Sequence, residues 1–310
     1  MTNTTTLAHL TDAHLTLHDR LRPRELIGKR AFSALNWRQR RRRMHLPENV
    51  GLITADIAAH APDHIVMTGD AVNFGLPIEF TRAADWLHSL GAPDDVSFVP
   101  GNHEAIHKGV SAEMIGAFGA FSTGDDGVVG YPYLRRRGQV AVVGVSTCIT
   151  TRLGRAQGEV GEPQLIRLAE LLREARGLCR VILIHHPPAG PCKPRKDLRD
   201  RAAFADVIAA EGAELILHGH NHVAQDSQLQ GPEGPVPVVG APSASAGFGS
   251  HDDPAEWRLI HVSRGGNSFQ IDVRRRRLTL DGSMEDAGVL SFVQPAPAPN
   301  ASCEKVSPLP

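Results

Sequence analysis

Five short segments of the chain carry aspartates, an asparagine and histidines, an inventory suited to binding two metal ions side by side. Carboxylate, amide and imidazole ligands suit borderline divalent metals such as manganese, iron and zinc. Most of the segments lie where an apolar, β-rich run gives way to a turn, so residues far apart in sequence are expected to converge on one rim of a sheet. The segments are Asp12-Ala13-His14, Gly69-Asp70, Gly101-Asn102-His103-Glu104, His185-His186 and Gly219-His220-Asn221-His222.

The spacing within the segments predicts which side chains act together. Residues at positions i and i+2 of a continuing strand point the same way, so Asp12 and His14 are expected to reach one ion. His220 and His222 have the same spacing, with the same consequence. Asp70 follows a glycine at a strand end, where a carboxylate can bridge two ions.

The elements that must position these residues alternate between strands and helices. This alternation predicts an α/β layered architecture, and the β-rich end of the chain predicts a mixed second sheet. We expect one domain over residues 1–293, with a basic insertion at about 20–48, and a disordered Pro/Ala-rich tail over 294–310. The expected strands are 5–10, 64–68, 96–99, 140–145, 181–184, 215–217, 236–239, 257–262 and 269–273, and the expected helices include 163–175 and 198–210.

Length and composition are ordinary for a soluble globular protein. The 310 residues are 41% hydrophobic and 22% charged, and the formal net charge of -1 favours no particular partner. Four widely spaced cysteines without a CxxC pair argue against a disulfide framework and a cysteine-based zinc site. No signal peptide is evident, and no apolar run approaches the roughly 20 residues of a membrane helix. We therefore expect a reduced cytoplasmic protein without a membrane span.

The ordered series DxH, GD, GNHE, HHPP and GHxH resembles the calcineurin-like metallophosphoesterase superfamily. Its HHPP block is similar to the phosphodiesterase branch, which includes cyclic-nucleotide and glycerophosphodiester phosphodiesterases. The resemblance implies a four-layer α/β/β/α sandwich of two mixed sheets flanked by helices. It also implies one metal bound by Asp12, His14, Asp70 and His222, and a second bound by Asp70, Asn102, His185 and His220, with Asp70 bridging.

Four further residues receive roles with alternatives. By the resemblance, His103 is the general acid or stabilises charge, and Glu104 either orients His103 or is a surface carboxylate. His186 either supports the ligands or faces the substrate. Arg195, shortly after the HHPP block, either contacts a phosphate or lies in an ordinary surface loop. The histidines expected to be only structural or on the surface are His9, His18, His45, His60, His64, His88, His107, His251 and His261.

The resulting hypothesis is hydrolysis of a small phosphodiester by metal-bound hydroxide, without a covalent enzyme intermediate. Two ions roughly 3.5–4 Å apart can clamp a phosphate ester and lower the pKa of a bound water from about 15.7 to near 7. A nuclease, or a lipid-linked pyrophosphatase or phosphomonoesterase, would use the same site. Outside the enzymes, the alternative is a phosphate-binding scaffold that keeps the fold.

Three arginine runs stand apart from this pattern, at 40–43, 135–137 and 274–277. Such runs can meet nucleic acid, an anionic membrane surface or a phosphorylated substrate. We favour a solvated helix face or ion pairing between subunits instead, which leaves a homo-oligomer open. A small phosphoester is therefore the expected partner and nucleic acid is not favoured. The segment 26–45, after the first metal block, is expected to cap the active site.

Overall fold

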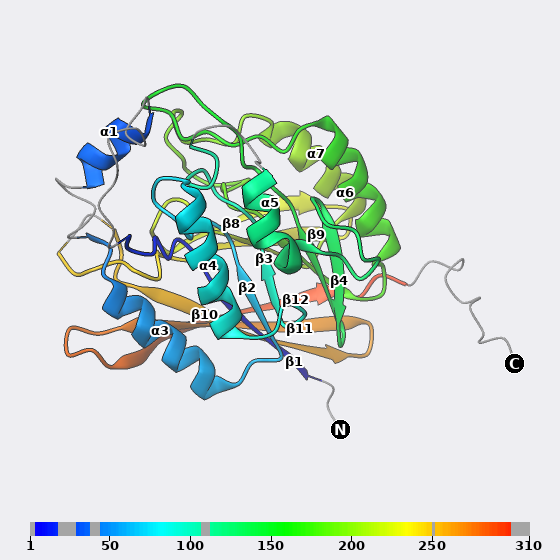
Figure 1. Ribbon diagram of the computed structural model, residues 1–310. Coiled ribbons are helices and arrows are strands. Elements are labelled where there is room, and N and C mark those ends of the chain that lie inside the picture. Colours follow the sequence, from blue (N-terminus) through cyan, green and yellow to red (C-terminus); the bar gives the residue numbers. More distant parts are fainter. Residues whose placement is uncertain (1–3, 18–28, 38–43, 107–111, 250–251, 299–310) are drawn as a thin grey trace, which may run out of the picture.

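Two six-stranded sheets lie face to face in the computed structural model, which describes residues 4–17, 29–37, 44–106, 112–249 and 252–298 (Figure 1). The first sheet has the order β12 (Met284–Pro295), β11 (Ser268–Leu278), β10 (Glu256–Gly265), β1 (Thr4–Leu10), β2 (His64–Met67) and β3 (Val96–Phe98). The second has the order β4 (Tyr133–Arg137), β5 (Val140–Gly144), β6 (Cys179–Leu183), β7 (Leu215–His218), β9 (Gly234–Gly240) and β8 (Gln225–Gly231). Both sheets are mixed: β1–β3 and β5–β6–β7–β9 run parallel, and the remaining strands pair antiparallel.

Apolar residues at alternate strand positions build separate core layers. Because successive side chains of a strand point to opposite faces, one strand serves two layers. Leu7 of β1 packs between the sheets with Val142 and Val181 of the second sheet. Leu10, on the opposite face of β1, packs with the helices outside the first sheet.

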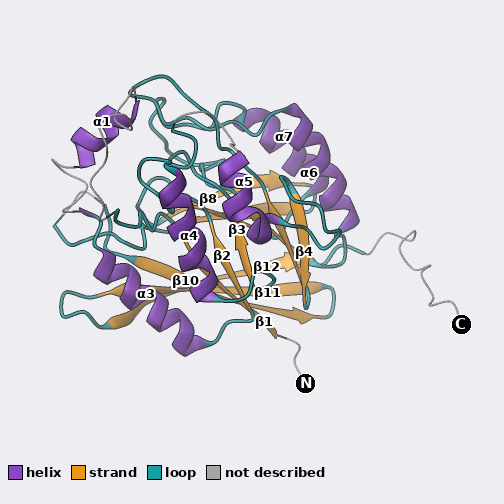
Figure 2. Cartoon of the chain, in the orientation of Figure 1, coloured by secondary structure: helices purple, strands orange, loops and turns teal. Residues whose placement is uncertain are grey.

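Helices cover the outer face of each sheet (Figure 2). The first sheet is covered by α3 (Pro47–His60), α4 (Pro77–Leu90) and α5 (Ala112–Phe118), followed by the 3₁₀ turn η3 (Gly119–Ser122), and the second by α6 (Glu162–Glu174) and α7 (Arg201–Glu211). Proline lies in the first turn of α3, α4 and α6, where a missing N–H costs no helical hydrogen bond. The predicted four-layer α/β/β/α sandwich is confirmed.

The structure differs from the predicted elements mainly at sheet edges. β4 and β12 were not expected, because the arginines of β4 and the largely exposed residues of β12 leave no apolar run. The late strands β10–β12 extend the first sheet rather than forming the second. β12 continues to Pro295, so the predicted tail start at 294 is two residues too early. Residues 299–310 of that tail lie outside the described residues.

The arginine run at 135–137 lies on β4 and is used within the molecule. The buried guanidinium of Arg135 donates to four backbone carbonyl oxygens at 2.7–2.9 Å. Arg136 pairs with Glu174 at 2.5 Å, and Arg137 pairs with Asp125 at 2.9 Å. This run therefore lies on a strand rather than a helix face, and its ion pairs join parts of one chain. The run at 40–43 lies outside the described residues.

The run at 274–277 lies on β11 and surrounds a buried carboxylate. Glu256 is fully buried and accepts hydrogen bonds from Arg258 at 2.6 Å, Arg275 at 3.1 Å and Arg277 at 2.7 Å. Burial alone would raise the pKa of Glu256, but the guanidinium groups outweigh it and lower the pKa. These cations therefore stabilise the fold from within.

Replacing Glu256 by glutamine is expected to lower the free energy of unfolding by about 3–5 kcal/mol, because the buried Arg258 loses its counter-charge. Urea denaturation measures the change. Glu170→Gln, in the exposed Arg167–Glu170 pair, is the control and should cost less than about 1 kcal/mol. Equal losses in the two variants would contradict a special contribution from the buried cluster.

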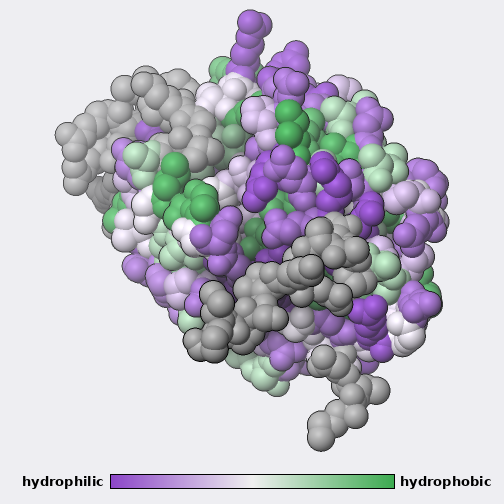
Figure 3. All heavy atoms as spheres, turned by 90° about the vertical axis from the view of Figure 1, so that its right-hand side faces the viewer, coloured by the Kyte–Doolittle hydropathy of each residue, from purple (hydrophilic) through white to green (hydrophobic). Residues whose placement is uncertain are grey.

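On the face shown in Figure 3, hydrophobic residues form small patches among hydrophilic ones. Surface ion pairs, such as Arg199 with Glu159 at 3.1 Å, join neighbouring segments. No helix in the described parts of the chain is long and apolar enough to cross a membrane.

Candidate metal centre

The carboxyl ends of parallel strands from both sheets meet at one rim of the molecule. Asp12 follows β1, Asp70 follows β2 and Asn102 follows β3, while His185 follows β6 and His220 follows β7. In open α/β sheets, ligands bind beyond the carboxyl ends of the strands. The topology thus brings the predicted ligands of all five segments to one place.

The backbone turns sharply at most of these positions. The φ angles are +53° at Asp12, +42° at His14, +53° at Asp70, +72° at His220 and +57° at His222. Non-glycine residues rarely adopt this left-handed conformation, which costs about 1–3 kcal/mol and clusters at functional sites. The i, i+2 argument requires the strands to continue, but β1 ends at Leu10 and β7 at His218, and the paired ligands converge through turns.

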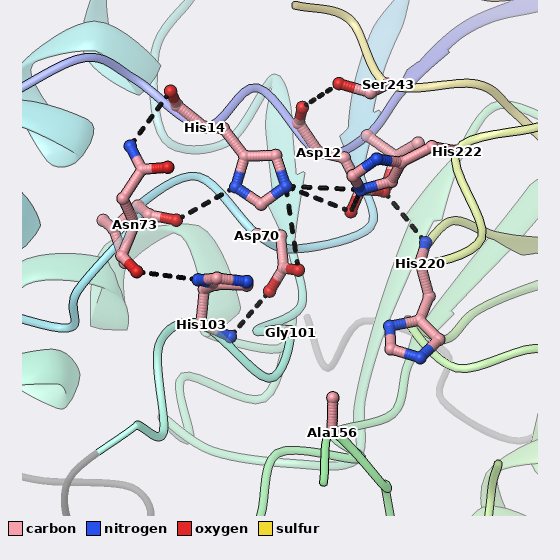
Figure 4. Close-up of polar contacts among 12 residues, drawn as sticks. Asp12, His14, Asp70, Asn73, Gly101, His103, Ala156, His220, His222 and Ser243 are labelled. Atoms are coloured by element: carbon pink, nitrogen blue, oxygen red, sulfur yellow. Dashed lines mark hydrogen bonds and ion pairs between the residues drawn. The ribbon is translucent and has the colours of Figure 1, made fainter. Parts of the chain in front are cut away.

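Asp12, His14 and His222 form the first group of side chains (Figure 4). His222 Nε2 lies 3.1 Å from Asp12 Oδ1 and 3.3 Å from His14 Nε2. His14 Nε2 also lies 4.0 Å from Asp70 Oδ2. The Asp70 carboxylate therefore borders this group.

Asp70, His185 and His220 form the second group. His185 Nε2 lies 3.4 Å from Asp70 Oδ2 and 3.2 Å from His220 Nδ1. The backbone N–H of His220 donates to Asp12 Oδ2 at 2.9 Å, which ties the two groups together. One oxygen of Asp70 faces both groups, as a bridging ligand must.

Backbone carbonyl oxygens set the tautomers of His14 and His185. His14 Nδ1 donates to the carbonyl of Val72 at 3.2 Å, and His185 Nδ1 donates to that of Thr68 at 2.6 Å. Because a carbonyl oxygen only accepts, Nδ1 carries the proton of each neutral ring. The lone pair of Nε2 is then directed at the two groups.

His220 and His222 are held in the same way. His220 Nε2 donates to the carbonyl of Lys196 at 3.0 Å, which leaves the Nδ1 lone pair directed at His185. His222 Nδ1 pairs with the Asp252 carboxylate at 3.0 Å, which leaves Nε2 directed at Asp12. Such partners orient the histidine ligands of metal sites and fix their tautomers.

The chemistry of the two groups fits a pair of metal ions. With these tautomers, His14 Nε2 and His222 Nε2 direct lone pairs at each other across 3.3 Å, which is repulsive unless a cation lies between them. Asn102 Oδ1 is buried and has no hydrogen-bond partner among the described residues. Coordination of an ion would satisfy this oxygen. Burial would lower the pKa of His185, but the Asp70 carboxylate raises it to about 9, so the site attracts positive charge.

His103 lies beside the first group. Its Nδ1 donates to the carbonyl of Asn73 at 2.7 Å, and its ring centroid is 4.9 Å from that of His14. Its backbone N–H donates to Asp70 Oδ1 at 2.7 Å. His103 thus contacts two of the six side chains of the groups, His14 and Asp70.

Glu104 fits neither of its expected roles, because it is buried and does not hold His103. Its carboxylate accepts hydrogen bonds from the backbone N–H groups of Gly101 at 2.7 Å, Ala71 at 2.7 Å, Asp70 at 3.1 Å and Val72 at 3.2 Å. Burial, with the nearby Asp70 charge, raises the pKa of Glu104 to about 7. The side chain joins the turn after β2 to the turn after β3, and thus positions Asp70.

His186 is fully buried behind His220, with ring centroids 4.2 Å apart. Its Nε2 donates to the carbonyl of Ala156 at 3.1 Å, and its Nδ1 lies 2.6 Å from Thr147 Oγ1. Burial lowers the pKa of His186 to about 3. This placement favours support of the His220 ring over contact with a substrate.

A cleft of about 350 Å³ opens over the two groups. Asp70, Asn102 and His103 line it, and Arg195 and Lys196 belong to the same lining. Arg195 thus lies where a phosphate contact was expected. Arg195 is also exposed in a surface loop, so this placement is compatible with both expectations.

The described part of the basic insertion also lies against the site. In α1 (Lys29–Asn36), Arg30 donates to the carbonyl oxygens of Phe74 at 3.1 Å and Gly75 at 2.6 Å. Ser33 of α1 and His45 line the cleft. The capping role expected for this insertion fits these residues, whereas residues 18–28 and 38–43 lie outside the described ones.

Several residues that hold the site carried no signal in the sequence. Asp252 follows the last metal block by 30 residues and has no motif of its own. Ser243 and Ser245 donate to the backbone carbonyl of Asp12 at 2.6 Å and 3.2 Å. Such long-range partners become visible only when the fold brings the segments together.

Replacing Asp252 by alanine is expected to weaken metal binding about 10–100-fold, because His222 loses the group that orients it. Competition with a fluorescent chelator measures the affinity. Asp226→Ala, at an exposed position of β8, is the control and should leave the affinity unchanged. Unchanged affinity in both variants would remove Asp252 from the centre.

Comparison with protein families connects the site to known proteins. The family model described as calcineurin-like phosphoesterase matches residues 5–224, a stretch that includes all the predicted ligands. A probable cyclic nucleotide phosphodiesterase of Synechococcus is 26% identical over 220 residues, covering 69% of this chain and 78% of that protein. A cAMP/cGMP dual specificity phosphodiesterase of Mycobacterium tuberculosis is 25% identical over 219 residues, covering 65% of this chain and 63% of that protein.

Solved structures share the fold at low sequence identity. A purple acid phosphatase from yellow lupin seeds is similar with a TM-score of 0.53 and 12% identity, over 94% of this chain and 54% of that chain. The Plasmodium protein GAP50, the anchor in the inner membrane complex, is similar with a TM-score of 0.51 and 10% identity, over 96% of this chain and 90% of that chain. These likenesses support the arrangement of two sheets between helices.

Proposed function

The chain belongs to the calcineurin-like phosphoesterase family and is a phosphoric ester hydrolase, and we propose that it hydrolyses a small phosphodiester at a dinuclear metal centre. The observation that carries the proposal is the Asp70 carboxylate, one oxygen of which faces both histidine groups. The names of the two bacterial relatives support a cyclic nucleotide as substrate. A glycerophosphodiester or a similar small diester is the nearest alternative.

The proposed ligand sets follow the two groups. Manganese, iron and zinc all suit these donors. Two such ions would hold the phosphate, neutralise its charge and activate a water molecule for in-line attack. The first set is Asp12, His14, Asp70 and His222, and the second is Asp70, Asn102, His185 and His220.

The remaining steps belong to residues of the cleft. In the proposal, His103 donates a proton to the departing alkoxide, and Arg195 contacts a phosphate oxygen. His186 packs against the His220 imidazole, and Asp252 holds the His222 imidazole in its tautomer. No side chain is assigned as a nucleophile, so the reaction has no covalent enzyme intermediate.

Metal analysis of the purified protein, combined with a substrate panel, tests the proposal. We expect about two ions per chain. With added manganese, the protein should hydrolyse diesters faster than monoesters, and a chelator should abolish this activity. Absence of both metal and activity would reject the enzyme in favour of a phosphate-binding scaffold. Preference for monoesters would favour a phosphomonoesterase at the same site.

Salt dependence separates the proposal from a nuclease. Contacts to a nucleic acid backbone make binding fall steeply with salt, whereas a small chromogenic diester should show little dependence. The intrachain ion pairs of the runs at 135–137 and 274–277 argue against binding of nucleic acid at these arginines.

Two further expectations stay predictions. One is a cytoplasmic location, which is based on the few and scattered cysteines, and the other is a homo-oligomer.

A further inference from the structure

We infer that His45, in the basic insertion, adds a third imidazole to the metal position formed by Asp12, His14 and His222, an inference that rests on the proposed metal centre. One ring nitrogen from each of His14, His45 and His222 lies within 4.8 Å of the others. The His45 ring centroid is 4.4 Å from that of His14 and 5.3 Å from that of His222. His45 was expected to be a structural or surface histidine, but it lines the cleft.

The backbone around His45 is fastened to the segment that follows β9. Leu46 N–H donates to the carbonyl of Ser245 at 2.8 Å, and Gly247 N–H donates to that of Met44 at 2.7 Å. His45 itself forms an isolated antiparallel bridge with Ala246. The backbone is therefore held by main-chain contacts on both sides of His45, and the residue is almost fully buried, with 3% of its surface exposed.

The His45 ring is oriented by a chain of hydroxyl groups that begins at a metal ligand. Ser243 Oγ donates to the Asp12 carbonyl at 2.6 Å, and Ser245 Oγ lies 3.0 Å from Ser243 Oγ and 3.2 Å from the same carbonyl. When the Ser245 proton is directed at one of these oxygens, its Oγ accepts from His45 Nδ1, 2.8 Å away. Nε2 is then the donor atom that we assign to the ion.

This arrangement repeats the one found at the predicted ligands. At His14 and His185, a backbone oxygen accepts from Nδ1 and Nε2 is directed at the centre. An oxygen partner on the far nitrogen is the usual companion of a histidine metal ligand. His45 differs in coming from the insertion rather than from a strand end.

An added imidazole has a consequence for the choice of metal. Imidazole nitrogen suits zinc and iron, whereas carboxylate and carbonyl oxygens suit manganese. A position with His14, His222 and His45 beside the carboxylates of Asp12 and Asp70 should therefore favour zinc or iron over manganese. Removal of His45 should therefore reduce the difference between the affinities for zinc and for manganese.

Titration of the metal-free protein with Zn²⁺ and with Mn²⁺, by competition with a chelator, tests the assignment. For His45→Ala and His45→Gln we expect one of the two zinc dissociation constants to rise about 10-fold or more, as for lost groups around metal sites. The manganese constants should change less, and the absorption spectrum of the Co²⁺-loaded protein should change. The matched control is His64→Gln. It removes a buried histidine that lies away from the centre and forms a hydrogen bond of 2.8 Å with Ser97.

Dissociation constants within twofold of wild type, with an unchanged cobalt spectrum, would overturn the assignment. Thermal unfolding of the metal-free forms identifies a variant that has lost its fold, and the glutamine variant keeps an amide near Ser245. If the wild-type protein binds one ion, the dinuclear proposal is overturned but the His45 assignment is not. The assignment is then tested by comparing the affinity for that ion between wild type and the His45 variants. Wild-type protein that binds no ion would overturn both.

Discussion

Replacing Asp70 by asparagine is expected to lower turnover about 10³-fold and to leave the purified protein deficient in metal. One oxygen of this carboxylate lies 4.0 Å from His14 Nε2 and 3.4 Å from His185 Nε2, so both proposed ions depend on its charge. Metal ions contribute several kcal/mol of charge stabilisation to such reactions, and each 1.36 kcal/mol is tenfold in rate. Asparagine keeps the shape and the oxygen that accepts from the His103 backbone, so the change isolates the charge.

Elemental analysis and turnover of the best diester substrate measure the two effects together. Asp85→Asn, at an exposed position of α4, is the control and should keep both metal and activity. A variant that loses activity while retaining both ions would show that Asp70 acts on the substrate instead. Retention of both properties would remove it from the bridging position.

The predicted ligands converge as expected, but the means of convergence was not predictable from the spacing. The i, i+2 argument holds only where a strand continues, whereas β1 and β7 both stop before the ligands. Asp12 and His14 meet because each takes a left-handed backbone conformation. Aspartate and histidine adopt this conformation more often than most residues, but only a few per cent of non-glycine residues do so, and their presence in the sequence therefore does not predict it.

The groups that surround the ligands were less predictable, because their roles come from distant partners. Glu104 is next to His103 in sequence, yet it accepts hydrogen bonds from the turn after β2. His45 is expected to be structural because no motif contains it, and its contacts with residues 245–247, distant in sequence, place it beside His14 and His222. The same holds for the edge strands β4 and β12, whose polar residues are explained by pairing rather than by an apolar pattern.

Replacing His103 by alanine is expected to leave both proposed ions bound and to lower turnover about 10²–10⁴-fold, the usual contribution of a general acid. His103 Nδ1 is held by the Asn73 carbonyl at 2.7 Å, which leaves Nε2 as the nitrogen we assign to proton transfer in the cleft. Elemental analysis and turnover test this, with the exposed His88→Ala of α4 as control.

The leaving group separates the two roles open to His103. A nitrophenolate can leave without receiving a proton, whereas an alkoxide needs one. If His103 is the general acid, its loss should therefore lower turnover far more for an alkyl diester than for a nitrophenyl diester. Equal losses on both substrates would instead assign His103 to charge stabilisation, and full activity on both would remove it from the mechanism. Loss of metal in the same variant would move His103 into the ligand set, since His14, Asp70 and His103 also offer donor atoms within 4.8 Å of one another.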